Sequence, residues 1–134
     1  MVKRGERSRI VLVMCGTLME GRRIARRVVS NRLAACVNII LGPAESFYTW
    51  KGKLEKAREY LLVMKTTMQC LAELENEVRR LHSYDVPEFI ALAITEGSEK
   101  YLSWLDHSLS GERKKAIRSS GILRRRAAPG RGRR

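Results

Sequence analysis

The stretch Phe47-Tyr-Thr-Trp-Lys-Gly-Lys-Leu-Glu55 has the pattern of a β-hairpin turn between two strands. Aromatic and β-branched residues precede Lys51-Gly-Lys53, and an apolar segment follows it. Gly52 can supply the positive φ that a tight turn often needs. An indole gains nothing from facing water, so we expect Trp50 to cover a ligand, a neighbouring subunit or the sheet of its own chain.

Four strand patterns and three helix patterns extend outward from this hairpin. The expected strands are 9–15, 33–41 continued through 45–50, 54–65 and 89–95, and the expected helices begin at Thr17, at Thr66–Gln69 and at Ser98. Thr17 and Glu20 have the spacing of a capping box, and Gly42-Pro43 must interrupt the second strand. The order predicts an α+β fold, a ferredoxin-like β-α-β-β-α-β sandwich with a long hairpin between its second and third strands and a short C-terminal helix.

The positive charge of the chain is concentrated at one end. The 134 residues carry a net charge of +13, and residues 111–134 hold ten Lys/Arg and one Glu, which leaves +4 for residues 1–110. We therefore expect a ferredoxin-like domain over 1–110 and a basic disordered tail over 111–134. Such a tail either contacts RNA, DNA or acidic lipid without specificity or is a solvated extension with no dedicated partner. Beyond weak contacts of this tail we do not expect nucleic-acid binding, because the sheet lacks exposed aromatic residues that would stack on bases.

Cysteine usage and hydropathy predict a cytoplasmic protein. The three cysteines, Cys15, Cys36 and Cys70, form no motif, and an odd number fits reduced thiols. There is no run of roughly 18 apolar residues for a membrane helix, and the apolar run 10–15 is too short for a signal peptide.

The apolar strands predict an assembly. The runs 10–14, 61–64 and 89–94 are apolar on both faces, whereas two helices cover only one face of a sheet. Several hundred Å² of uncovered apolar sheet corresponds to roughly 10 kcal/mol or more at about 25 cal/mol per Å². We therefore expect an obligate oligomer that packs sheet to sheet, with the long hairpin as an arm between subunits.

The topology gathers candidate metal ligands at one end of the sheet. Cys15, His82 and Glu88 offer thiolate, imidazole and carboxylate, a set that suits Cu or Zn. Each has a purely structural alternative: a small core residue for Cys15, a partner of a helix C-terminus for His82, and a partner of backbone amides for Glu88. Because the sequence contains no nucleophile–base set, P-loop or HExxH motif, we do not expect an enzyme.

A second group of polar and aromatic residues falls near the hairpin and inside the third strand. Glu59 and Lys65 flank an apolar run, where they either line an inter-subunit ligand cleft or form an ion pair across the subunit seam. The expected cleft residues are Tyr48, Trp50, Glu59, Lys65 and Tyr84.

Several motifs together resemble the CutA divalent-cation tolerance proteins. They are Leu33-Ala-Ala-Cys-Val-Asn-Ile39, Tyr48-x-Trp50-x-Gly52-Lys53-Leu54-Glu55, Lys65-Thr66, His82-x-Tyr84-x-x-Pro87-Glu88 and Tyr101-Leu-x-Trp104-Leu105. The resemblance spans about Arg9 to Leu109. It implies a cytosolic homotrimer similar in architecture to the PII signalling proteins, linked to tolerance of copper and other divalent cations and without an established reaction.

The resemblance also implies a copper site made by Cys15, His82 and Glu88. Some relatives carry two consecutive histidines before the Pro-Glu motif, and the first of them is the described ligand. This chain has Leu81 there, so His82 is the imidazole that remains. By analogy with the PII proteins, the alternative function is a metabolite sensor with ligands bound between subunits.

Overall fold

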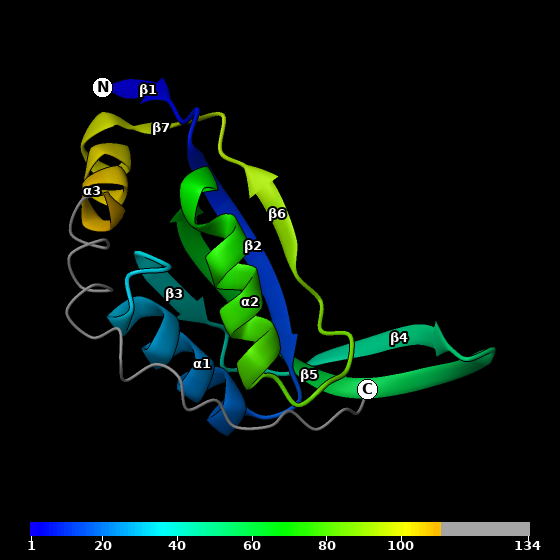
Figure 1. Ribbon diagram of the computed structural model, residues 1–134. Coiled ribbons are helices and arrows are strands. Elements are labelled where there is room, and N and C mark those ends of the chain that lie inside the picture. Colours follow the sequence, from blue (N-terminus) through cyan, green and yellow to red (C-terminus); the bar gives the residue numbers. More distant parts are fainter. Residues whose placement is uncertain (111–134) are drawn as a thin grey trace.

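The computed structural model describes residues 1–110, so the expected basic tail at 111–134 lies outside the described residues. The sheet order β3-β5-β2-β6 is antiparallel throughout, and β4 pairs with β5 beyond it (Figure 1). This arrangement confirms the predicted ferredoxin-like α+β fold. The elements are β1 Val2–Arg4, β2 Ser8–Cys15, α1 Leu18–Ser30, β3 Cys36–Ile39, β4 Ala44–Trp50, β5 Lys53–Thr67, a 3-10 turn Met68–Cys70, α2 Leu71–Leu81, β6 Ile90–Ala93, β7 Glu96–Ser98 and α3 Glu99–Leu109.

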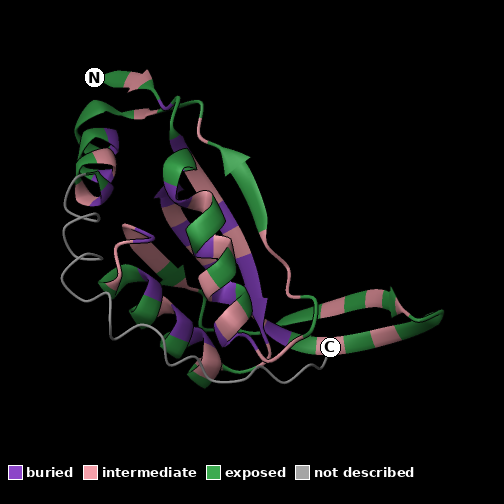
Figure 2. Ribbon diagram, viewed as in Figure 1, coloured by how far each residue is buried: buried purple, intermediate pink, exposed green. Residues whose placement is uncertain are grey.

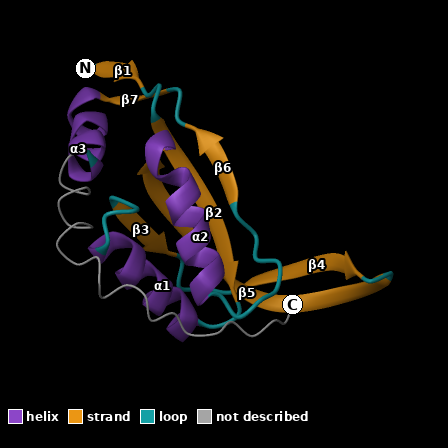
Figure 3. Ribbon diagram, in the orientation of Figure 1, coloured by secondary structure: helices purple, strands orange, loops and turns teal. Residues whose placement is uncertain are grey.

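One face of the sheet is covered by α1 and α2, which lie side by side across it (Figure 3). Both helices are amphipathic, with one apolar stripe turned to the sheet. The stripe packs against alternate residues of β2 and β5, because successive side chains of a strand point to opposite faces. This core contains Val11, Val13, Cys15, Ile24, Val28, Leu62, Met64, Leu74 and Val78.

The opposite face of the sheet is apolar and partly open. Cross-strand register places Leu12 beside Val63 and Ile90, and Ile10 beside Leu92, on this second face. Ile90 and Leu92 are 46% and 47% exposed, and β6 is exposed along its whole length (Figure 2). The predicted two-faced apolar strands are therefore present, and in the single chain nothing within residues 1–110 buries β6.

The β4–β5 hairpin projects well beyond the body of the domain (Figure 1). Its turn has positive φ at two successive residues, 51° at Lys51 and 80° at Gly52, between the paired Trp50 and Lys53. This is the geometry of a two-residue type I′ turn, as the sequence predicted for Gly52. The arm exposes 62% of Phe47 on β4, so its apolar surface lies open in the single chain.

The second predicted strand, 33–41, is shorter than expected at both ends, because β3 covers Cys36–Ile39. The amides of Leu33 and Ala34 both donate to the carbonyl of Val28, at 2.9 and 3.2 Å, and so complete the end of α1. Amides used in this way cannot join the ladder, and the first amide that donates to β5 is that of Ala35, to the carbonyl of Lys65 at 2.8 Å, directly before β3 begins at Cys36.

A small second sheet, not predicted from the sequence, joins the N-terminus to the last helix. β1 pairs with β7 in antiparallel register, and the amide of Glu99 donates to the carbonyl of Met1 at 2.6 Å. Arg7 forms a salt bridge of 2.8 Å with Asp106 on α3. Because β1 is short and charged, alternation alone did not mark it as a strand.

Candidate metal centre

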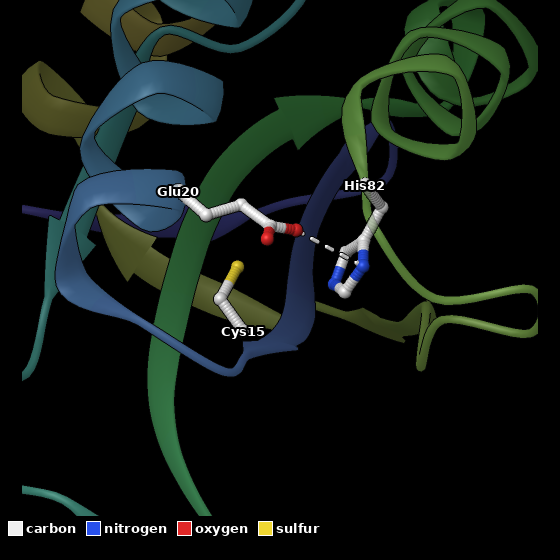
Figure 4. A group of neighbouring side chains, drawn as sticks. All are labelled: Cys15, Glu20 and His82. Atoms are coloured by element: carbon white, nitrogen blue, oxygen red, sulfur yellow. Dashed lines mark ion pairs between the residues drawn. The ribbon is translucent and has the colours of Figure 1, made fainter. Parts of the chain in front are cut away.

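Three side chains from separate elements converge at one end of the sheet (Figure 4). Cys15 is the last residue of β2, Glu20 lies in the first turn of α1, and His82 directly follows α2. One potential ligand atom from each lies within 4.8 Å of the other two. Cys15 and His82 are buried and Glu20 is partly buried, so the group lies inside the domain.

Glu20 holds the segment after α2 against the start of α1. The Thr17 hydroxyl caps α1 by accepting the Glu20 amide at 3.1 Å, which is one half of a capping box. In place of the other half, the Glu20 carboxylate accepts bonds from the amide and hydroxyl of Ser83 at 2.9 and 2.8 Å. Its Oε2 also lies 3.2 Å from Nδ1 of His82.

The imidazole of His82 is 1% exposed and fixed at both nitrogens. Nε2 lies 2.7 Å from the carbonyl of Met14, which can only accept, so Nε2 carries a proton. The amide of Tyr84 donates to Nδ1 at 3.1 Å. A metal-binding histidine commonly donates its other nitrogen to a carbonyl in this way, which leaves Nδ1, the atom beside Glu20, as the ligand atom.

The thiol of Cys15 is held in its neutral form. Burial, followed by the charges of Glu20 and Glu59, raises the pKa of Cys15 from its ordinary 9.0 to about 12, against a smaller opposing effect of Arg23. A thiol with this pKa is a poor nucleophile at neutral pH. A bound metal ion, by contrast, deprotonates a coordinating thiol outright.

The donor set is chemically suited to a borderline-soft metal ion. Thiolate, imidazole and carboxylate are the protein ligands of Zn²⁺, and the first two also suit copper. Ligand atoms around a tetrahedral Zn²⁺ lie roughly 3.3–3.8 Å apart, so a modest contraction of the group would bring its donors to three of the four positions of such a shell. Nδ1 would then exchange the Tyr84 amide for the metal.

Sequence reasoning anticipated two of these three residues. Cys15 and His82 are together as expected, whereas the partly buried Glu88 is not in the described group of close ligand atoms. Glu20 was recognised only as half of a capping box. The available signal was its position in the first turn of a helix that begins just after Cys15, which returns its side chain toward the strand end.

The five expected cleft residues are dispersed within a single chain. Tyr84 donates its hydroxyl to Glu59, a carboxylate 2% exposed, at 2.9 Å. Lys65, six residues further along β5 and so about 20 Å away, instead contacts the side-chain oxygen of Asn38. Tyr48 and Trp50 lie on the projecting hairpin.

The chain is a small ferredoxin-like α+β domain. A thiol, a carboxylate and an imidazole meet inside it at the end of β2, and together they are a donor set of the metal-binding type. The family model for the CutA1 divalent ion tolerance protein matches residues 9–108. The chain therefore belongs to the CutA1 family.

Proteins from distant organisms are similar to this chain in sequence. The chain is 46% identical over 99 residues to the chloroplastic protein CutA of Arabidopsis thaliana, a match covering 74% of this chain and 54% of the plant protein. It is 44% identical over 96 residues to the divalent-cation tolerance protein CutA of Thermus thermophilus, covering 72% of this chain and 92% of that protein. The chain thus spans about half the length of the plant relative and almost all of the bacterial one.

Solved structures confirm the fold. CutA from Synechococcus elongatus superimposes with a TM-score of 0.77 at 32% identity, over 82% of this chain and 96% of that one. CutA from Archaeoglobus fulgidus, described as a periplasmic divalent cation tolerance protein, gives 0.74 at 37% identity, over 77% and 99%. In residues 1–110 of this chain, no helix is both long and apolar enough to cross a membrane.

Proposed function

We propose that this protein acts in divalent-cation tolerance by binding metal ions, with copper as the principal ion and without catalysing a reaction. The observation that carries the proposal is the convergence of Cys15, Glu20 and His82 inside the domain. Relatives named divalent-cation tolerance proteins support the same role.

The proposed ligands are Cys15 through its thiolate and His82 through Nδ1. Two carboxylates are candidates for a third position: Glu88, expected from the family resemblance, and Glu20, which is close to both other ligands. Three cysteines without disulfides suit a reducing compartment, and we place the protein in the cytoplasm.

The functional unit that we propose is a homotrimer with a PII-like architecture. It is supported by the open apolar face that includes Ile90 and Leu92, and by the projecting β4–β5 hairpin with its exposed Phe47 and Leu54. Packing such faces against other copies would remove them from water, and the hairpin projects from its own domain, where another copy can contact it.

Calorimetric titration with Cu²⁺ and Zn²⁺, in the absence of oxygen, tests the site. We expect wild type to bind and both Cys15→Ser and His82→Ala to weaken binding by tenfold or more, a typical effect of losing a ligand or its support. Cys70→Ser is the matched control, because Cys70 is buried in another cluster beside α3. Comparison of Glu20→Gln with Glu88→Gln identifies the carboxylate ligand, and equal affinity in every variant would refute the site.

A second candidate function is small-metabolite sensing at inter-subunit clefts. It is favoured by the buried Glu59 carboxylate and the Tyr84 hydroxyl that approaches it beside Gly16, where an added Cβ would lie 3.2 Å from that hydroxyl. Trp50 fluorescence, in a Trp104→Phe background so that only one indole is observed, tests it against a panel of anionic and zwitterionic metabolites. A silent indole across the whole panel would argue against this function.

A further inference from the structure

One face of α1 is a concentrated patch of arginine. Arg22, Arg23, Arg26 and Arg27 are all exposed, because Gly21, Ile24 and Val28 of the same helix turn into the core. We call these four residues the arginine face. They form two pairs at i and i+4, and like charges at that spacing repel each other, so the arrangement opposes helix stability until an anion binds.

Neighbouring carboxylates leave most of this charge uncompensated. Glu20, which is the one acidic residue of α1, is directed inward to Ser83 and His82. Glu77 of α2 forms bonds of 3.0 and 2.6 Å with Arg80 and lies 3.8 Å from Arg27. The guanidinium groups of Arg22 and Arg26 have no hydrogen-bond or ion-pair partner among residues 1–110.

Guanidinium groups in two rows are suited to a phosphate chain. Arginine binds phosphate through two parallel hydrogen bonds, and residues four apart on a helix lie about 6 Å apart along its axis. Arg23 donates to the carbonyl of Leu81 at 2.9 Å and Arg27 lies beside Glu77, so Arg22 and Arg26 are the pair best placed to bind neighbouring phosphates of one strand. Its charge is independent of the basic segment 111–134, which carries ten further Lys/Arg in the sequence.

We propose that the arginine face binds the phosphate backbone of nucleic acid without sequence preference. A helix that binds a membrane surface inserts its apolar face into the lipid, but the apolar face of α1 is used in the core of the domain. The four arginines are accompanied by no aromatic residue of α1 that would stack on bases, so only backbone contacts are available. The face also lies on the helix-covered side of the sheet, opposite the side that we propose for assembly.

Fluorescence anisotropy with labelled 20-nucleotide single-stranded RNA and a 20-base-pair DNA duplex tests this proposal on the full chain. The test variant is Arg22→Gln/Arg26→Gln. The matched control is Arg4→Gln/Arg58→Gln, which lowers the net charge equally at two exposed positions away from α1. Thermal melting establishes that both variants fold.

We expect the α1 variant to bind at least one probe about tenfold or more weakly than wild type at about 100 mM salt, with the control close to wild type. The slope of log affinity against log salt should fall by roughly 1.4 to 1.8, the value for two lost phosphate contacts. Equal weakening in both variants, absence of binding to either probe, or stronger α1-dependent binding to vesicles of phosphatidylserine and phosphatidylcholine than to both probes would overturn the proposal.

Discussion

The hydroxyl of Tyr84 donates a 2.9 Å hydrogen bond to the carboxylate of Glu59, which is 2% exposed. The bond ties the segment after α2 to the strand β5, beside the candidate metal centre. A hydrogen bond to a buried charged group contributes about 1.5–3 kcal/mol, because its loss leaves a desolvated carboxylate without that donor.

Tyr84→Phe should therefore lower the free energy of unfolding by about 1.5–3 kcal/mol. Urea denaturation at one fixed protein concentration measures the change. Tyr60→Phe is the matched control, because the Tyr60 hydroxyl has no hydrogen-bond partner among the described residues. Equal midpoints for the two variants would show that the bond is energetically unimportant.

The raised pKa of Cys15 predicts that the free energy of unfolding falls at alkaline pH. Its pKa is about 12 in the folded chain and close to 9.0 when unfolded, so the unfolded state alone releases the proton as the pH rises above 9. The stabilisation is complete below pH 9 and is lost between pH 9 and 12, by up to roughly 1.4 kcal/mol per pH unit. Denaturation between pH 8 and 11 should show a steeper decline in wild type than in Cys15→Ala. Parallel curves would contradict this origin of the alkaline sensitivity.

Gly5 is required where the N-terminal segment passes the residues directly after β6. A Cβ added there would lie 2.5 Å from the backbone oxygen of Ile94, which cannot rotate away. Gly5→Ala should destabilise the protein by about 1–3 kcal/mol and speed amide exchange in β1 and β7. Gly42→Ala provides the comparison, since an added Cβ there meets no atom within 4 Å. Unchanged amide exchange rates in Gly5→Ala would mean that the N-terminal segment shifts to accommodate the added Cβ without loss of stability.

Leu92→Glu tests the open face of the sheet. The residue is 47% exposed in the single chain, so its replacement should leave the isolated fold intact while placing a charge in the proposed subunit interface. Sedimentation velocity should then show a smaller species than wild type. Met19→Glu introduces the same charge at a side chain 79% exposed on α1 and should sediment like wild type. An assembly that tolerates both changes would place the interface elsewhere.

Local chemistry made most of the fold predictable. The turn at Lys51-Gly52 and the hydroxyl cap of Thr17 depend on residues adjacent in sequence, and both form as expected. The continuous apolar runs that indicated β2 and β5 likewise depend on residues adjacent in sequence. The start of β3 was missed because the amides of Leu33 and Ala34 close α1, a competition between two elements that no single-segment pattern reveals.

The candidate site was only partly predictable for a related reason. Strand and helix ends indicated that Cys15 and His82 would meet. Glu20 joins the group because its carboxylate accepts hydrogen bonds from Ser83, 63 residues away in sequence, and not from the backbone at the start of its own helix. These bonds form because the segment after α2 passes the start of α1. Sequence periodicity does not reveal that two such distant segments lie together.

The β1–β7 ladder has a mechanical consequence. Its strands run antiparallel, and Met1 lies at the end of the ladder beside Glu99. A force applied to the N-terminus would therefore break the hydrogen bonds of the ladder one after another, starting at Met1, and not all at once. In an optical-trap experiment, β1 would separate from β7 at low force. The salt bridge between Arg7 and Asp106 would be the next side-chain contact along the chain to oppose the force.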